Sequence, residues 1–219
     1  MNNSSIIKTT GLSYHYSKDE QTLFDIGLNV ERGSIYGFLG PNGSGKTTTL
    51  SLLLGLLNNQ KGDIEIFGQH LHSNRIDILK KIGSLVETPS LYGHLTAKEN
   101  LEVYREVYGV SKARIAKVLD IVGLEDTGKM TAKKFSLGMK QRLAIALALL
   151  PNPELLILDE PTNDLDLPTL AVLENFLSEY QGCLLIVSHD RYFMDRLVDH
   201  LFVFEGNGNI RDFPGNYSL

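Results

Sequence analysis

The stretch SIYGFLGPNGSGKTTTL, residues 34–50, carries the strongest structural signal in the chain. Its first half is an apolar run typical of a buried strand, and a helical pattern follows over 46–57. Between them, GPNGSGKT (40–47) matches the spacing G-x-x-x-x-G-K-[ST] without a departure. Glycines let backbone N–H groups turn inward around a phosphate, and the start of the following helix adds the positive end of its dipole.

This context predicts a site for the phosphates of a nucleotide. We expect Lys46 to contact the β and γ phosphates and the Thr47 hydroxyl to bind Mg²⁺. A glycine-rich turn without a ligand is the alternative, and the flanking strand and helix favour the phosphate site over it. The predicted cradle comprises Gly40, Pro41, Asn42, Gly43, Ser44, Gly45, Lys46, Thr47 and Thr48.

A second motif, LLILDEP at 155–161, places two acids at the end of an apolar strand. Successive strand residues face opposite ways, so we predict different roles for the two carboxylates. Asp159 is expected to hold the magnesium, and Glu160 to polarise the attacking water. A solvated strand end is the alternative interpretation.

Composition narrows the class of protein. Of 219 residues, 42% are hydrophobic and 21% are charged, and the net charge is −5. That charge argues against binding nucleic acid through the overall field of the protein.

The single cysteine, Cys183, favours a reducing compartment. The longest apolar run, 143–150, is far shorter than the roughly 20 residues of a membrane-spanning helix, so any membrane role is expected to come through a partner.

Strand and helix patterns divide the chain into parts. Short β-type runs occur at 34–40, 63–68, 155–160, 183–189 and 201–206. Helical patterns occur at 46–57, 96–108, 112–122 and 168–180. We predict one α/β domain, with a core formed by 1–87 and 151–219 and a helical lobe inserted at about 88–150.

Three further motifs appear in the order found in ABC-type ATPases: SLGMKQR at 136–142, NDLD at 163–166 and IVSHD at 186–190. With these motifs the chain resembles that superfamily over essentially its whole length. The resemblance implies a RecA-like mixed sheet core with an inserted helical subdomain, hydrolysis of ATP with Mg²⁺, and a head-to-tail dimer closing on ATP. In that dimer, the cradle of one subunit faces the signature of the other.

The resemblance also assigns residues. Ser136 and Gly138 match the ABC signature, whereas Leu137 and Met139 depart from its commonest residues. Asp166 falls in the D-loop, His189 matches the switch histidine, and Tyr16 matches the aromatic residue that lies against adenine. Without the resemblance, Ser136 is a good helix N-cap and His189 a strand-end histidine.

The segment SLVETPSLYGHL, residues 84–95, places Glu87 where most ABC ATPases have glutamine. Glutamate there is typical of bacitracin and lantibiotic transporters. The resemblance implies that Glu87 contacts the magnesium and the attacking water, with Leu91, Tyr92 and Leu95 facing a membrane partner. A solvated loop acid is the alternative.

The two ends of the chain resemble different relatives. Residues 1 to about 160 resemble the ATP-binding subunit of a peptide exporter, which implies a separate permease and a place on the cytoplasmic face of the membrane. Residues from about 161 resemble the ABC-F class, whose members act on ribosomes. The chain lacks the second ATPase unit of that class, so we expect the transporter role, with a ribosome-linked ATPase or a mixed chain of the two as the alternative.

Overall fold

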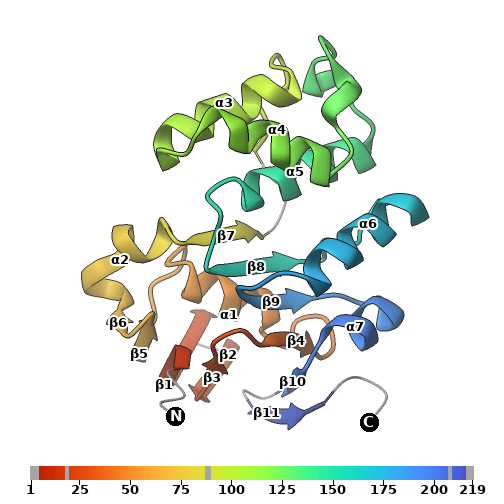
Figure 1. Ribbon diagram of the computed structural model, residues 1–219. Helices are drawn as coiled ribbons and strands as arrows, with labels where there is room; N and C mark the ends of the chain where they lie inside the picture. The colour runs from red at the N-terminus through yellow and green to blue at the C-terminus, as the bar shows by residue number, and fades with distance from the viewer. Residues whose placement is uncertain (1–4, 18–19, 87–89, 207–208, 216–219) are drawn as a thin grey trace. The chain divides into compact units, whose positions relative to one another are not determined.

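The computed structural model describes residues 5–17, 20–86, 90–206 and 209–215. The chain forms two compact units, one of residues 1–79 and 182–219 and the other of residues 80–181 (Figure 1). The second unit takes in two strands as well as a group of helices. The sequence-based division into a core and a lobe, with boundaries near 88 and 150, stays a prediction.

In the first unit, an antiparallel sheet is built around the long strand β1. β1 pairs with β2, β3 and β5, and β5 continues the sheet to β6. The buried faces carry aliphatic side chains such as Ile7, Leu12 and Ile66, which are fully buried. The strands are β1 (Ser5–Ser17), β2 (Glu20–Ile26), β3 (Asn29–Glu31), β5 (Lys61–Ile66) and β6 (Gln69–His70).

The same unit holds parallel strands in the order β10, β4, β9, with β11 antiparallel at the outer side of β10. All five residues of β9 are buried, as the uninterrupted apolar run predicts for a strand covered on both faces. The strands are β4 (Ile35–Leu39), β9 (Cys183–Val187), β10 (His200–Gly206) and β11 (Asn209–Pro214). The helices are α1 (Lys46–Leu53), α2 (Leu71–Leu79) and α7 (Arg191–Leu197).

The second unit combines a parallel strand pair with helices. β7 (Ile82–Leu85) pairs with β8 (Leu155–Asp159), and α3, α4 and α5 pack on one another. The helices are α3 (Ala97–Tyr108), α4 (Lys112–Ile121), α5 (Leu137–Leu149) and α6 (Leu167–Ser178), with short 3₁₀ turns η1 (Glu125–Thr127) and η2 (Ala132–Lys134). None of the helices in the described ranges combines the length and apolar character that crossing a bilayer requires.

The start of α3 has the capping box that its sequence predicts. Thr96 Oγ1 accepts a hydrogen bond from the Glu99 backbone N–H at 3.2 Å, and Glu99 Oε2 accepts one from the Thr96 backbone N–H at 2.8 Å. The bonds that the Glu99 carboxylate accepts from the Thr96 backbone N–H and hydroxyl lower the pKa of Glu99 below its ordinary value. The reciprocal pair satisfies two N–H groups that have no partner within the helix.

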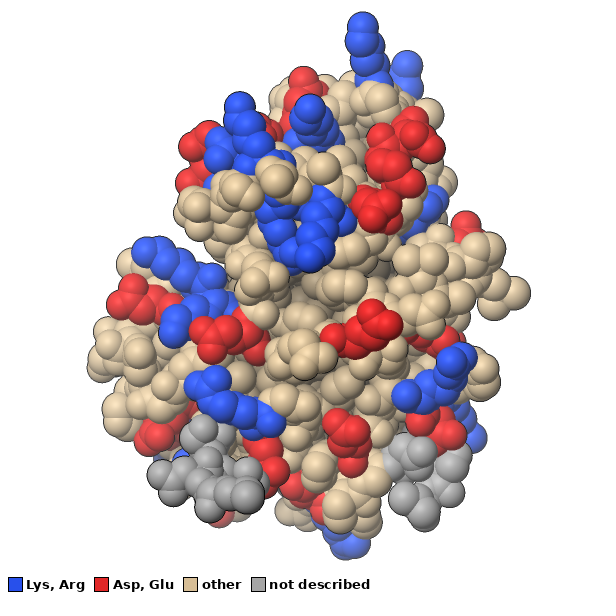
Figure 2. All heavy atoms as spheres, viewed as in Figure 1, with Lys and Arg blue, Asp and Glu red and all other residues tan. Residues whose placement is uncertain are grey.

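Acidic and basic side chains are interspersed on the face of the molecule that Figure 2 shows, and neither sign dominates it. A protein that binds nucleic acid electrostatically concentrates Lys and Arg on one face or along one stripe. Among the described residues that this view shows, Lys and Arg do not form a single stripe.

The close packing of β7 on α5 leads to a stability prediction. A Cβ added to Gly83 would lie 1.9 Å from the Ala148 carbonyl oxygen and 2.9 Å from Pro153 Cγ. We expect Gly83→Ala to lower the free energy of unfolding by about 1–3 kcal/mol, because backbone must move to admit the methyl group. Denaturant unfolding of parent and variant measures this difference.

Gly27→Ala is the matched control, because its added Cβ would meet only the Thr9 carbonyl oxygen, at 3.9 Å. Equal unfolding curves for the Gly83 variant and the parent would contradict the packing that we describe.

Candidate active site

The phosphate cradle lies between β4 and α1 in the first unit. Gly40, Gly43 and Gly45 have φ angles of 151°, 80° and 99°, a region that side chains other than glycine rarely adopt. Space is also short: an added Cβ would lie 2.6 Å from the Phe204 carbonyl oxygen at Gly40 and 2.6 Å from Leu23 Cδ2 at Gly45. Both the backbone angles and the packing therefore require glycine at the two ends of the loop.

Two features of the cradle suit a ligand that accepts hydrogen bonds. The N-cap of α1 is Gly45, so no side chain caps the first N–H groups of this helix. Ser44 Oγ is buried and has no hydrogen-bond partner within the described residues. Buried polar groups are normally paired, so this hydroxyl fits a site whose missing partner is a ligand oxygen. The residues present thus suit an anionic phosphate group.

Lys46 lies inside the loop. Its side chain is buried, and Nζ donates hydrogen bonds to the carbonyl oxygens of Gly40 at 2.8 Å and Pro41 at 3.0 Å. A lysine ammonium at this position can also form charge-assisted hydrogen bonds with phosphate oxygens. The contact between Lys46 and the nucleotide phosphates stays a prediction.

Tyr16 lies next to the helix that follows the cradle. Its hydroxyl is 3.3 Å from Thr48 Oγ1, and its ring is 61% exposed. The Tyr14 ring meets it edge-on, with centroids 5.0 Å apart. The structure therefore brings Tyr16 to the cradle with an exposed ring, which is the arrangement that stacking on a base requires.

His189 follows the end of β9 in the same unit. It is exposed, and it lines a pocket of about 430 Å³ together with Gly40, Ser188 and Arg191. The next residue, Asp190, caps α7 by accepting a hydrogen bond from the Phe193 N–H at 3.0 Å. The predicted switch histidine thus lines the same pocket as the first glycine of the cradle.

Asp159 and Glu160 lie in the second unit and line one open pocket of about 740 Å³. β8 ends at Asp159, and Glu160 has a φ of 48°, outside strand geometry. The alternation used in the sequence analysis therefore does not extend to Glu160, because the chain turns there. A positive φ is uncommon for glutamate, and residues with such backbone angles cluster at active sites and ligand-binding sites.

Gln141 is a site residue that the sequence analysis missed. It projects from α5, and its Nε2 donates hydrogen bonds to the carbonyl oxygens of Glu160 at 3.3 Å and Pro161 at 3.4 Å. These bonds link the helix of the signature motif to the turn that carries Glu160. The residue stands inside the quoted motif SLGMKQR, but no local pattern indicates which backbone its amide would meet.

The signature and D-loop motifs also meet within the second unit. Ser136 caps α5 by accepting a hydrogen bond from the Met139 N–H at 3.2 Å, as its N-cap interpretation predicts. A Cβ on Gly138 would lie 2.6 Å from the Asp164 carbonyl oxygen, so the absence of a side chain permits this approach. Asp166 caps α6, and its bonds from the Thr169 side chain and N–H lower the pKa of its carboxyl.

The loop before α3 is organised by Asn100, which sequence patterns also did not reveal. This side chain is fully buried; Oδ1 accepts from the Tyr92 N–H at 2.9 Å, and Nδ2 donates to the Tyr92 and Thr96 carbonyl oxygens at 3.1 and 2.9 Å. Tyr92 is 44% exposed, and Leu91 and Leu95 are partly exposed. Glu87, the predicted joint residue, lies outside the described residues.

Comparisons with known proteins identify the family. The sequence model of the ABC transporter family matches residues 23–163. The chain is 45% identical over 216 residues to the bacitracin transport ATP-binding protein BcrA of Bacillus licheniformis, covering 96% of this chain and 70% of that protein. It is 40% identical over 219 residues to the lantibiotic transport ATP-binding protein SrtF of Streptococcus pyogenes, covering 98% and 94%.

Solved structures agree with the sequence comparisons. An ATP-binding subunit of an ABC transporter superposes with a TM-score of 0.88 at 29% identity, covering 96% of this chain and 90% of that one. The ATP-binding cassette MJ0796, solved as a dimer in a post-hydrolysis state with ADP and Pi, gives 0.83 at 25% identity, covering 95% and 98%.

The chain therefore belongs to the ABC transporter family. It is an ATP-binding subunit with ATPase activity, and the predicted α/β P-loop fold of the ABC type is confirmed. The transporter interpretation is favoured over the ribosome-linked alternative, because the bacitracin and lantibiotic relatives match almost the whole chain.

Proposed function

We propose that this protein hydrolyses Mg-ATP in a head-to-tail pair of subunits and thereby drives a separate membrane permease that exports a peptide or an antibiotic. The observation that supports the export class is the 40–45% identity, over 96–98% of this chain, to ATP-binding proteins named for bacitracin and lantibiotic transport. Such a role places the protein on the cytoplasmic face of the membrane, held there by the permease.

Each predicted residue has a role in this proposal. Lys46 and the glycine loop bind the phosphates, and Tyr16 stacks on adenine. Thr47 and Asp159 hold the Mg²⁺, which offsets the phosphate charge. Glu160 orients and polarises the attacking water. His189 contacts the γ-phosphate, and Glu87 contacts the metal. Ser136, Gly138 and Asp166 serve the nucleotide of the partner subunit.

The loop of Leu91, Tyr92 and Leu95 is our candidate for the contact with the permease. Exposed aromatic and leucine side chains are frequent anchors at protein interfaces. Asn100 holds the backbone of this loop from within, so the loop offers its side chains on a preorganised scaffold. Preorganisation lowers the entropy that binding would otherwise cost.

Replacing Asn100 tests this arrangement. We expect Asn100→Ala to lower the free energy of unfolding by about 1–3 kcal/mol, because the backbone groups at Tyr92 lose their buried partners. ATP affinity should stay at the parent level, whereas the amount of permease recovered with the protein should fall. Unfolding curves, nucleotide titration and pull-down from detergent-solubilised membranes measure the three effects.

The exposed Asn58 provides the matched control, and Asn58→Ala should behave as the parent in all three measurements. Full recovery of the permease with a folded Asn100→Ala protein would contradict our proposal that this loop contacts the permease.

Co-purification distinguishes the two classes of function. The tagged protein, purified from its own host, should bring an integral membrane protein identified by mass spectrometry. Cells with the parent protein should also survive higher concentrations of an exported antibiotic than cells with Glu160→Gln. Recovery of ribosomal proteins in stoichiometric amount, without a membrane protein, would contradict the proposal.

A further inference from the structure

A β-hairpin that follows the cradle helix in the chain brings together three side chains of metal-binding types. β5 and β6 pair antiparallel, with Ile66 opposite Gln69 and Glu65 opposite His70. The connecting residues Phe67 and Gly68 have φ angles of 55° and 74°. Two positive φ angles are the geometry of a type I′ turn, which fixes the register of a two-residue hairpin.

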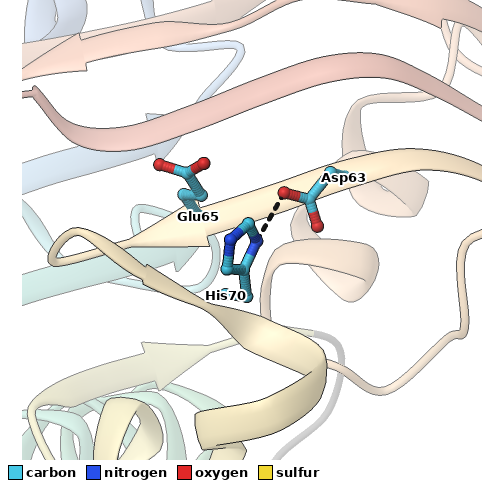
Figure 3. Close-up of side chains that lie close together, drawn as sticks. All are labelled: Asp63, Glu65 and His70. Atoms are coloured by element: carbon cyan, nitrogen blue, oxygen red, sulfur yellow. Dashed lines mark hydrogen bonds and ion pairs between the residues drawn. The ribbon is translucent and has the colours of Figure 1, made fainter.

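The alternation of β5 sorts its side chains onto two faces. Ile64 and Ile66 are buried, so Asp63 and Glu65 share the opposite face. Because His70 pairs with Glu65, it stands on this same outer face, and Figure 3 shows His70 in contact with Asp63 and Glu65 nearby. His70 Nδ1 lies 2.6 Å from Asp63 Oδ2, and ligand atoms of all three residues lie within 4.8 Å of one another.

We propose that Asp63, Glu65 and His70 form a binding site for a divalent transition-metal ion of the Zn²⁺ class. Two carboxylates offset the charge of a dication, and the imidazole nitrogen favours Zn²⁺, Co²⁺ or Ni²⁺ over Mg²⁺ and Ca²⁺, which prefer oxygen ligands. The Asp63 and His70 side chains are 49% and 61% exposed. Water therefore has access to complete the coordination shell around three protein ligands.

The hairpin holds the ligands near one another before the metal binds. The ladder fixes the backbones of Glu65 and His70, and the Asp63 carboxylate is already in contact with the imidazole. Because the ligand atoms already lie within 4.8 Å of one another, little conformational entropy opposes binding. A bound ion would join β5 to the two-residue strand β6, which few backbone hydrogen bonds hold, and would stabilise the hairpin.

Titration of the untagged, nucleotide-free protein tests the site. Zn²⁺ is added with Mg²⁺ in excess, so that the oxygen-rich nucleotide site does not contribute. We expect one saturable Zn²⁺ site with micromolar affinity by calorimetry, and a higher unfolding temperature in Zn²⁺. Co²⁺ should give a visible absorption band from the mixed nitrogen and oxygen ligands.

Three ligand variants and one control complete the experiment: His70→Gln, Asp63→Asn, Glu65→Gln and His72→Gln. Loss of an outer-shell partner alone weakens metal sites by about 10–100-fold, so each ligand variant should weaken Zn²⁺ binding at least about tenfold and remove the Co²⁺ band. His72 is an exposed histidine two residues beyond the cluster, and its variant should bind as the parent does.

Circular dichroism and ATP binding should show that all four variants are folded. The proposal is overturned if the parent shows no saturable Zn²⁺ binding. It is equally overturned if His70→Gln and His72→Gln bind Zn²⁺ alike, because the affinity would then come from scattered surface groups.

Discussion

We expect the Glu160→Gln variant to bind ATP as the parent does and to hydrolyse it about 10²–10⁴-fold more slowly. Glutamine keeps the size of the side chain and its hydrogen-bonding capacity, but it cannot accept the proton of the attacking water. The turn at Glu160 is held by Gln141 through backbone carbonyls, so the substitution should leave the loop in place. Phosphate release under saturating Mg-ATP measures the rate.

The exposed Glu179 in the same unit offers a matched control, because Glu179→Gln changes the charge equally and touches no predicted site residue. Its hydrolysis rate should equal that of the parent. A Glu160→Gln protein that hydrolyses ATP at the parent rate would show that another group activates the water.

The slow variant should also reveal the assembly. With hydrolysis blocked, Mg-ATP should hold two chains together, because each nucleotide bridges the cradle of one chain and the Ser136 region of the other. Light scattering on Glu160→Gln is expected to give a dimer with Mg-ATP and a smaller mass without it. A monomer at all protein concentrations in Mg-ATP would argue against head-to-tail pairing of the isolated subunit.

The second large effect is expected at Lys46. Lys46→Met should weaken ATP binding by about 1.5–3 kcal/mol, or about 10–150-fold in Kd, because a charge-assisted bond to the phosphates is lost. Methionine has an unbranched side chain of similar length but no charge. Removal of a buried ammonium also removes its desolvation cost, so stability should change much less than affinity.

Fluorescent-nucleotide titration and thermal unfolding separate the two effects. Lys61→Met serves as the control, since Lys61 is exposed on β5 and loses the same charge. If both lysine variants bind ATP equally well, the position of Nζ inside the loop has no bearing on the ligand, and our assignment of the cradle lysine is wrong.

The phosphate loop and the buried strands could be predicted from the sequence because their signals are local. The pattern at 40–47 needs glycine for backbone reasons that hold in any surrounding fold, and the apolar runs at 155–159 and 183–187 are buried strands as expected. The capping box of Thr96 and Glu99 likewise involves residues three positions apart.

The antiparallel strands β1, β2 and β3 were not predicted from hydrophobic patterns. Their pairings have several register shifts, and β1 contains Gly11 with a positive φ, so the alternation is interrupted. Such strands are stabilised by their neighbours in the sheet rather than by their own periodicity.

Dependence on neighbouring segments also explains why some site residues could be identified only in the folded chain. Gln141 contacts a backbone about 20 positions away, Asn100 depends on the course of the preceding loop, and His70 meets Asp63 through the hairpin register. Residue types and their spacing are enough to predict a phosphate loop, because a short continuous segment forms the whole backbone turn. Contacts between separated segments depend on where packing and sheet pairing place each backbone, which no single segment encodes.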